Sequence, residues 1–127
     1  MIFCRFLYFA NWSLKTGVYS SNLRIIFFSH FTKSNLKSIL ISSHIVPWSK
    51  SNDDERLDVE NGILLSPNID SLFDKHLISF EDDGSILISD KLDSLNRQSL
   101  SIDGNIKIPV SEGMKKYLKR HREEFNK

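Results

Sequence analysis

Two aspartates stand four residues apart in the stretch NGILLSPNIDSLFDK, which runs from Asn61 to Lys75. If this stretch is helical, Asp70 and Asp74 share one face of the helix. Carboxylates are rarely buried unless they are paired or hold a metal, so two interpretations are open: a salt-bridged surface edge and a cation site. Such oxygen ligands suit Mg²⁺ or Mn²⁺, with water and phosphate completing the coordination.

His44 and Asn61 precede the aspartates and add two further chemical functions. The imidazole of His44 can take a proton from water, and the amide of Asn61 both donates and accepts hydrogen bonds. A base and a hard cation are together what the hydrolysis of a phosphodiester requires. Each residue also has a plainer interpretation: a lone histidine is most often a polar surface group, and Asn61 before Gly62 suits a tight turn.

The segment that carries His44 predicts a strand and then a loop. LKSILISSHIVPW is rich in β-branched residues and predicts a strand over residues 38–42, which Pro47 terminates. His44 is therefore expected at a strand end. The charged run SKSNDDERLDVE, residues 49–60, has no period and predicts a loop. Asn61 follows this loop, and its amide can tie the loop backbone to the strand of His44.

A second strand and a helix are expected next. Residues 62–65 predict the strand, and Ser66 followed by Pro67 predicts an N-cap and the first helical position. The helix is expected from Pro67 to about His76. Its apolar members fall at helical spacing and should face a core: Ile69, Leu72, Phe73 and Leu77.

The rest of the chain predicts a hairpin, a strand and a basic helix. LISFEDDGSILIS consists of two alternating runs around DDG, which favours a hairpin. IKIPV predicts a strand and SEGMKKYLKRHREEFNK a C-terminal helix. Its basic residues suit a solvated face or contacts with a nucleic-acid backbone: Lys115, Lys116, Lys119 and Arg122. The fold class indicated is α+β.

Composition limits the classes of protein that fit. A chain of 127 residues has room for about one domain, and 17 basic against 16 acidic residues give a net charge of +1, so any basic surface must be local. The single cysteine, Cys4, excludes an internal disulfide and a zinc site built from cysteine pairs, and it fits a cytoplasmic location. Arg5 interrupts the apolar start, which is shorter than the roughly 18 residues of a spanning helix, so we expect no membrane partner.

The order and spacing of four residues resemble the motif of the HNH endonuclease family: His44, Asn61, Asp70 and Asp74. In that family a ββα-metal core carries a general-base histidine, a middle asparagine and a metal ligand at the helix start. The stretch beginning SHIVPW and containing LFDKHLISF is similar to a restriction-type subgroup with a His-Ile-x-Pro-Trp strand end and a Phe-Asp pair in the helix. The resemblance implies that His44 is the general base, that Asn61 is the middle asparagine, and that Asp70 and Asp74 bind the metal.

The sequence departs from the family pattern at three positions. Ser43 precedes the base, where many members have a histidine or aspartate that helps to bind the metal. Ser66 and Ile69 occupy the places where one pair of structural-zinc cysteines lies in other members. We therefore expect no structural zinc and a core held by packing.

The resemblance implies a magnesium-type or manganese-type endonuclease that acts on DNA in restriction or defence. Lys50, Arg56 and Lys75 lie near enough in sequence to contact phosphates. Residues 1–35 show no clear period, and we expect them to be a remnant of a truncated or frame-altered region before a nuclease-like domain over residues 36–127. Two competing hypotheses remain open: a catalytically degenerate module that binds nucleic acid, and a protein-binding domain.

Overall fold

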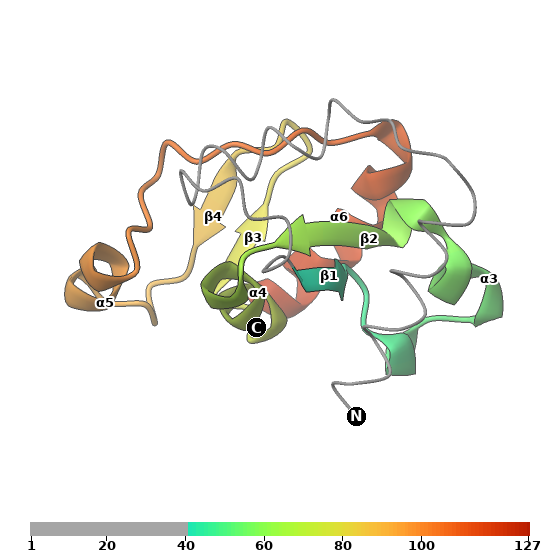
Figure 1. Ribbon diagram of the computed structural model, residues 1–127, viewed down its shortest axis with the longest axis horizontal. Helices are drawn as coiled ribbons and strands as arrows, with labels where there is room; N and C mark the ends of the chain where they lie inside the picture. Colours follow the sequence, from blue (N-terminus) through green and yellow to red (C-terminus); the bar gives the residue numbers. More distant parts are fainter. Residues whose placement is uncertain (1–40) are drawn as a thin grey trace.

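Two antiparallel strand pairs and a C-terminal helix organise the chain (Figure 1). The computed structural model describes residues 41–127, so the predictions for residues 1–35 and for the start of the first strand lie outside the described part. The α+β class is confirmed. In chain order the elements are β1 (Ile41–His44), η2 (Trp48–Lys50), α3 (Asp53–Leu57), η3 (Val59–Asn61), β2 (Gly62–Leu65), α4 (Pro67–Asp74), β3 (Ile78–Phe80), β4 (Ile86–Ile88), α5 (Ser94–Ser99) and α6 (Glu112–Phe125).

The strands β1 and β2 pair antiparallel, with His44 opposite Gly62 at one end of the ladder. The predicted strand end at His44 and the predicted order of strand, loop, strand and helix are therefore confirmed. Pro67 takes the first position of α4, where its missing N–H would have had no helical partner. The helix packs on both strands, so the three elements form one ββα unit.

The helix α4 ends at Asp74, two residues before the end predicted at His76. His76 adopts a left-handed backbone with φ of 53°. Its N–H donates a hydrogen bond to the carbonyl of Phe73 at 3.0 Å, and the N–H of Leu77 donates one to the carbonyl of Leu72 at 2.9 Å. These two bonds make a Schellman cap, which satisfies the last carbonyls and turns the chain towards β3.

The charged run 49–60 is not the irregular loop that the sequence predicts, because it folds into η2, α3 and η3. The helix α3 is started by a capping box: the side chain of Asn52 accepts from the N–H of Glu55 at 2.9 Å, and the side chain of Glu55 accepts from the N–H of Asn52 at 3.0 Å. Each side chain satisfies a backbone donor that the helix leaves without a partner. A helix of five residues is too short to show a hydrophobic period.

The predicted hairpin is confirmed as β3 and β4, whereas the predicted strand IKIPV is only partly formed. Residues 106–110 contribute a single isolated bridge, between Lys107 and Ser85. Gly84 has φ of +87°, and a Cβ atom there would lie 1.8 Å from the carbonyl oxygen of Ile108. Glycine is therefore required where this segment crosses the turn. The helix α5 was not predicted from the sequence; Asp93 caps it by accepting a hydrogen bond from the N–H of Asn96 at 2.8 Å.

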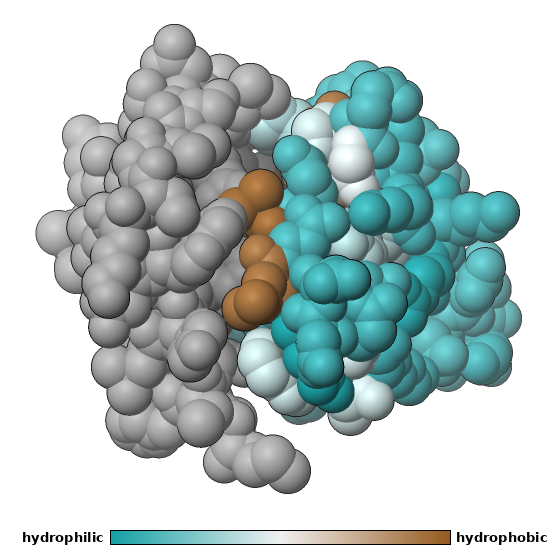
Figure 2. Space-filling view, turned by 90° about the vertical axis from the view of Figure 1, so that its right-hand side faces the viewer, coloured by the Kyte–Doolittle hydropathy of each residue, from teal (hydrophilic) through white to brown (hydrophobic). Residues whose placement is uncertain are grey.

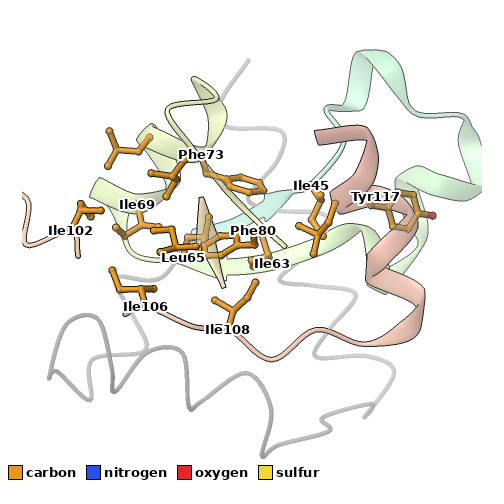
Figure 3. Close-up of a cluster of buried hydrophobic side chains, with 14 of the residues drawn as sticks. Ile45, Ile63, Leu65, Ile69, Phe73, Phe80, Ile102, Ile106, Ile108 and Tyr117 are labelled. Carbon is orange, nitrogen blue, oxygen red and sulfur yellow. The ribbon is translucent and has the colours of Figure 1, made fainter. Parts of the chain in front are cut away.

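Apolar side chains from β2, β3, β4, α4, α6 and the segments between them form one core, and Figure 3 labels many of its members. Ile69 belongs to this core and Ser66 is the N-cap of α4, so packing and helix initiation explain the two residues that stand where the family resembled in sequence has zinc cysteines. The face shown in Figure 2 is mostly hydrophilic over the described residues, with apolar residues gathered in a narrow band. In the described part no helix is long and apolar enough to cross a membrane.

His121 joins α6 to the ββα unit through its buried imidazole. Its Nε2 donates to the carbonyl of Phe73 at 3.0 Å and its Nδ1 accepts from the hydroxyl of Ser79 at 2.8 Å. The imidazole also stacks on the ring of Phe73, with 3.8 Å between centroids and 4° between planes. Burial is the largest effect and lowers the pKa of His121 to about 4, so this imidazole is neutral in the folded protein at pH 7.

Acid should destabilise the fold through His121. The unfolded chain takes up a proton near pH 6.5, and the folded protein resists doing so until about pH 4, so stability present above pH 6.5 is lost as the pH falls through this interval. We expect the free energy of unfolding to fall by about 2 kcal/mol between pH 7 and pH 5. Urea unfolding at the two pH values measures the change, and His121→Gln should reduce it. An equally steep change in the variant would contradict this assignment.

Candidate active site

The side-chain amide of Asn61 holds the segment that surrounds the candidate base. Asn61 is fully buried, and its Oδ1 accepts from the N–H of Val46 at 2.8 Å. Its Nδ2 donates to the carbonyl of Glu55 at 3.0 Å and lies 3.3 Å from Oγ of Ser51. One carboxamide thus connects the residues after β1 with the helix α3 and with the start of β2.

His44 lies at the end of β1 with only 3% of its surface exposed. Its Nε2 is 3.1 Å from the carbonyl oxygen of Arg56. A carbonyl only accepts hydrogen bonds, so Nε2 carries the proton in the neutral imidazole and the basic lone pair is on Nδ1. The carbonyl of Arg56 belongs to the last turn of α3, where carbonyls lack a partner within the helix. The short helix thereby fixes the tautomer of the candidate base.

The side chains of Trp48 and Arg56 lie beside His44. The indole of Trp48 meets the imidazole edge to face, with 5.7 Å between centroids and 84° between planes. The guanidinium of Arg56 lies 5.0 Å from the centroid of the indole, and its Nε donates to the carbonyl of Trp48 at 3.2 Å. Trp48 nevertheless exposes 44% of its surface and therefore lies outside the hydrophobic core.

The two aspartates of α4 sit in different surroundings. Asp70 is half-buried in the first turn of the helix, and Asp74 is exposed in its last turn. A carboxylate in the first turn also complements the helix dipole, so the surface interpretation of Asp70 remains open. Their assignment as metal ligands stays a prediction.

A divalent ion needs several oxygen or nitrogen ligands that lie close together. Within residues 41–127 no group of three or more histidine, cysteine or carboxylate side chains could hold a metal. Ser43 is buried, and its hydroxyl has no hydrogen-bond partner within the described residues. Mg²⁺ is usually bound through one or two carboxylates, with water and substrate phosphate as the other ligands. The two carboxylates of Asp70 and Asp74 therefore suit an ion whose other ligands are water and phosphate. They do not suit an ion that is coordinated by protein side chains alone.

The three predicted phosphate contacts lie on two segments. Nζ of Lys50 pairs with Glu124 at 3.1 Å, and the guanidinium of Arg56 pairs with Asp53 at 2.7 Å. Lys75 is exposed at the C-cap of α4. Surface ion pairs of this kind contribute about 0–1 kcal/mol, so a phosphate can replace the carboxylate partner.

The basic residues of α6 are mostly engaged within the protein. Lys116 pairs with Asp58 at 3.3 Å, Arg122 pairs with Asp82 at 2.7 Å, and Lys115 pairs with Glu112. These contacts favour the solvated, structural interpretation of the helix over a dedicated nucleic-acid surface.

A family model of HNH endonucleases matches residues 28–81, a segment that includes β1, β2, α4 and β3. This segment belongs to the HNH endonuclease family. The resemblance in the sequence is thereby confirmed for residues 28–81, and the HNH endonuclease family as a class acts on nucleic acid. No curated protein matches the chain. The roles of His44, Asn61, Asp70 and Asp74 within the HNH segment stay predictions.

The HNH segment contains functional contacts that sequence reasoning missed. Ser51 contributes its hydroxyl to the hydrogen bonds of Asn61, and the backbone carbonyl of Arg56 orients His44. A backbone group leaves no signal in residue type. The capping motif Asn52-x-x-Glu55 was the available signal, because it predicts that a helix starts at Asn52 and so continues through Arg56.

Asn61→Ala should loosen the whole segment from Ile45 to Glu60. The change removes the acceptor of the buried Val46 N–H and the donors to the carbonyl of Glu55. Leaving buried backbone groups without partners should lower the free energy of unfolding by about 2–4 kcal/mol. Hydrogen exchange across residues 45–60 should become faster, and nuclease activity should fall with it.

Two variants serve as controls for Asn61→Ala. Asn68→Ala removes an exposed asparagine and should change stability by no more than about 0.5 kcal/mol. Asn61→Asp keeps the acceptor for Val46 but loses the donors. If Asn61→Ala lost activity with unchanged exchange protection, Asn61 would act on metal or substrate rather than on the architecture.

Proposed function

We propose that this chain is an endonuclease that hydrolyses DNA phosphodiester bonds with the help of a divalent metal ion. The observation that carries the proposal is the hydrogen bond from Nε2 of His44 to the carbonyl of Arg56, at 3.1 Å. It favours the imidazole tautomer that a general base needs, in the residue to which the sequence resemblance gives that role.

The proposed step begins with a water molecule beside Nδ1 of His44. Nδ1 takes a proton from the water as the water oxygen forms a bond to phosphorus and the bond to the leaving oxygen breaks. The imidazolium that results still donates from Nε2 to the carbonyl of Arg56, so the same contact stabilises both protonation states. A divalent ion held by Asp70 and Asp74 would supply positive charge to the phosphate and the leaving oxygen.

Cationic side chains near His44 support a polyanionic substrate. Lys50 and Arg56 extend from the segment that surrounds His44, and both are held by exposed or partly exposed ion pairs. Lys75 lies at the end of the helix that carries the two aspartates. Contacts of this kind position a nucleic-acid backbone without reading its sequence. A restriction or defence role in the cytoplasm is proposed from the subgroup motif His-Ile-x-Pro-Trp, residues 44–48.

A plasmid-nicking assay with Mg²⁺ or Mn²⁺, and with the ion chelated, tests the proposed function. The parent protein should nick DNA only with the ion, and His44→Ala should reduce the rate by about 10²- to 10⁴-fold, the contribution of a positioned proton transfer. His76→Asn is the matched control, because His76 lies outside the predicted site in a left-handed conformation that asparagine tolerates. A loss below about tenfold in His44→Ala would exclude the base role. DNA binding without nicking would favour the degenerate binding module.

Metal binding tests the two aspartates separately. Asp70→Asn and Asp74→Asn should each weaken Mn²⁺ binding in calorimetry, because each removes one anionic oxygen ligand. Asp70→Asn should have the larger effect, since Asp70 occupies the motif position and is the less exposed of the two. Asp90→Asn, at an exposed position before α5, should bind the ion like the parent. Parent-like binding by both Asp70→Asn and Asp74→Asn would show that these are ordinary surface carboxylates.

A further inference from the structure

Trp48 is an exposed aromatic side chain next to the candidate base. In the described part of the chain three large apolar side chains are exposed: Trp48, Leu57 and Leu95. Trp48 is the one whose ring contacts His44. A large ring that remains 44% exposed forgoes much of the stabilisation that burial would give, so its position calls for a function other than packing.

The exposed indole of Trp48 is held in place by its neighbours. Its backbone lies in η2, which is closed by the hydrogen bonds from Lys50 N–H to Pro47 at 2.9 Å and from Ser51 N–H to Trp48 at 3.3 Å. Arg56 binds both the carbonyl and the ring of Trp48. A ring fixed in this way loses little conformational entropy when a ligand stacks on it.

The chemistry around the indole fits a nucleotide with an accessible base. An aromatic face accepts any nucleobase, because every base has a π-face. The guanidinium of Arg56 lies beside the indole, where it can contact the phosphate of the same nucleotide. Its present partner, Asp53, is an exposed carboxylate that a phosphate can replace. A paired and stacked base does not offer its face, so the arrangement favours an unpaired nucleotide.

We propose that Trp48 is a positioning residue that stacks on an unpaired nucleobase beside the phosphodiester on which His44 acts. The inference rests on the proposed nuclease function and narrows the substrate class to nucleic acid with an unpaired base near the cleaved bond. Stacking places the adjoining phosphate at His44, because the two rings are only 5.7 Å apart between centroids. The positive charge of Arg56 then attracts the phosphate of the same nucleotide.

Binding without cleavage tests this proposal. Fluorescence anisotropy with the divalent ion chelated compares a short labelled single-stranded DNA with an abasic oligonucleotide of equal length and charge. The parent should bind the base-containing strand more tightly, and Trp48→Leu should weaken that binding by about 5- to 150-fold without changing abasic binding. Trp48→Phe should retain most of the affinity, because it keeps an aromatic face.

Leu95→Ala provides the matched control, since Leu95 is 71% exposed on α5, at the opposite end of the molecule from α3 (Figure 1). It should bind both oligonucleotides like the parent. Equal binding of the two oligonucleotides by the parent would overturn the stacking proposal while leaving the nuclease proposal intact, and this outcome does not depend on whether Trp48→Leu folds. No binding of either oligonucleotide by the parent would also overturn the stacking proposal, while the nuclease proposal is decided separately by the plasmid-nicking assay.

Discussion

The carboxamide of Asn61 is the interaction on which the candidate active site depends. Buried backbone groups must find hydrogen-bond partners, and among residues 41–127 no strand pairs with the segment after β1 to supply them. Asn61 supplies an acceptor to Val46 and a donor to Glu55 from one fully buried side chain. The same residue precedes Gly62, which pairs with His44 across the ladder. One residue thus contributes both to the position of the candidate base and to the shape of the segment that surrounds it.

The helix α6 supports the same segment from a distant part of the chain. Arg120 pairs with Glu55 at 2.8 Å and donates to the carbonyl of Lys50 at 2.7 Å, and the hydroxyl of Tyr117 donates to Asp58 at 2.5 Å. Burial would raise the pKa of Asp58, but the hydrogen bonds from Tyr117 and Glu60 N–H outweigh it and keep this carboxylate ionised. The HNH segment ends at residue 81, so part of the support for the segment around the candidate base comes from outside the family match.

Sequence patterns predicted the parts of the fold whose signals are local or periodic. The order of the ββα unit followed from Pro47, Ser66 and Pro67, and the DDG turn predicted the hairpin. Short helices such as α3 and α5 were missed, because five or six residues show no hydrophobic period. Candidate site residues could be named by type and spacing. Their surroundings could not, because the carbonyl of Arg56 and the contacts of α6 depend on tertiary structure. The exposure of Trp48 was unpredictable for the same reason.

The tautomer of His44 is the most direct measure of how this site works. The nitrogen-15 spectrum of the imidazole at neutral pH, assigned by comparison with His44→Gln, distinguishes a proton on Nε2 from one on Nδ1. The hydrogen bond to the carbonyl of Arg56 predicts the neutral form with the proton on Nε2, so that Nδ1 is the nitrogen that accepts a proton from water. A predominant Nδ1–H tautomer would contradict the assignment of His44 as the general base in this geometry.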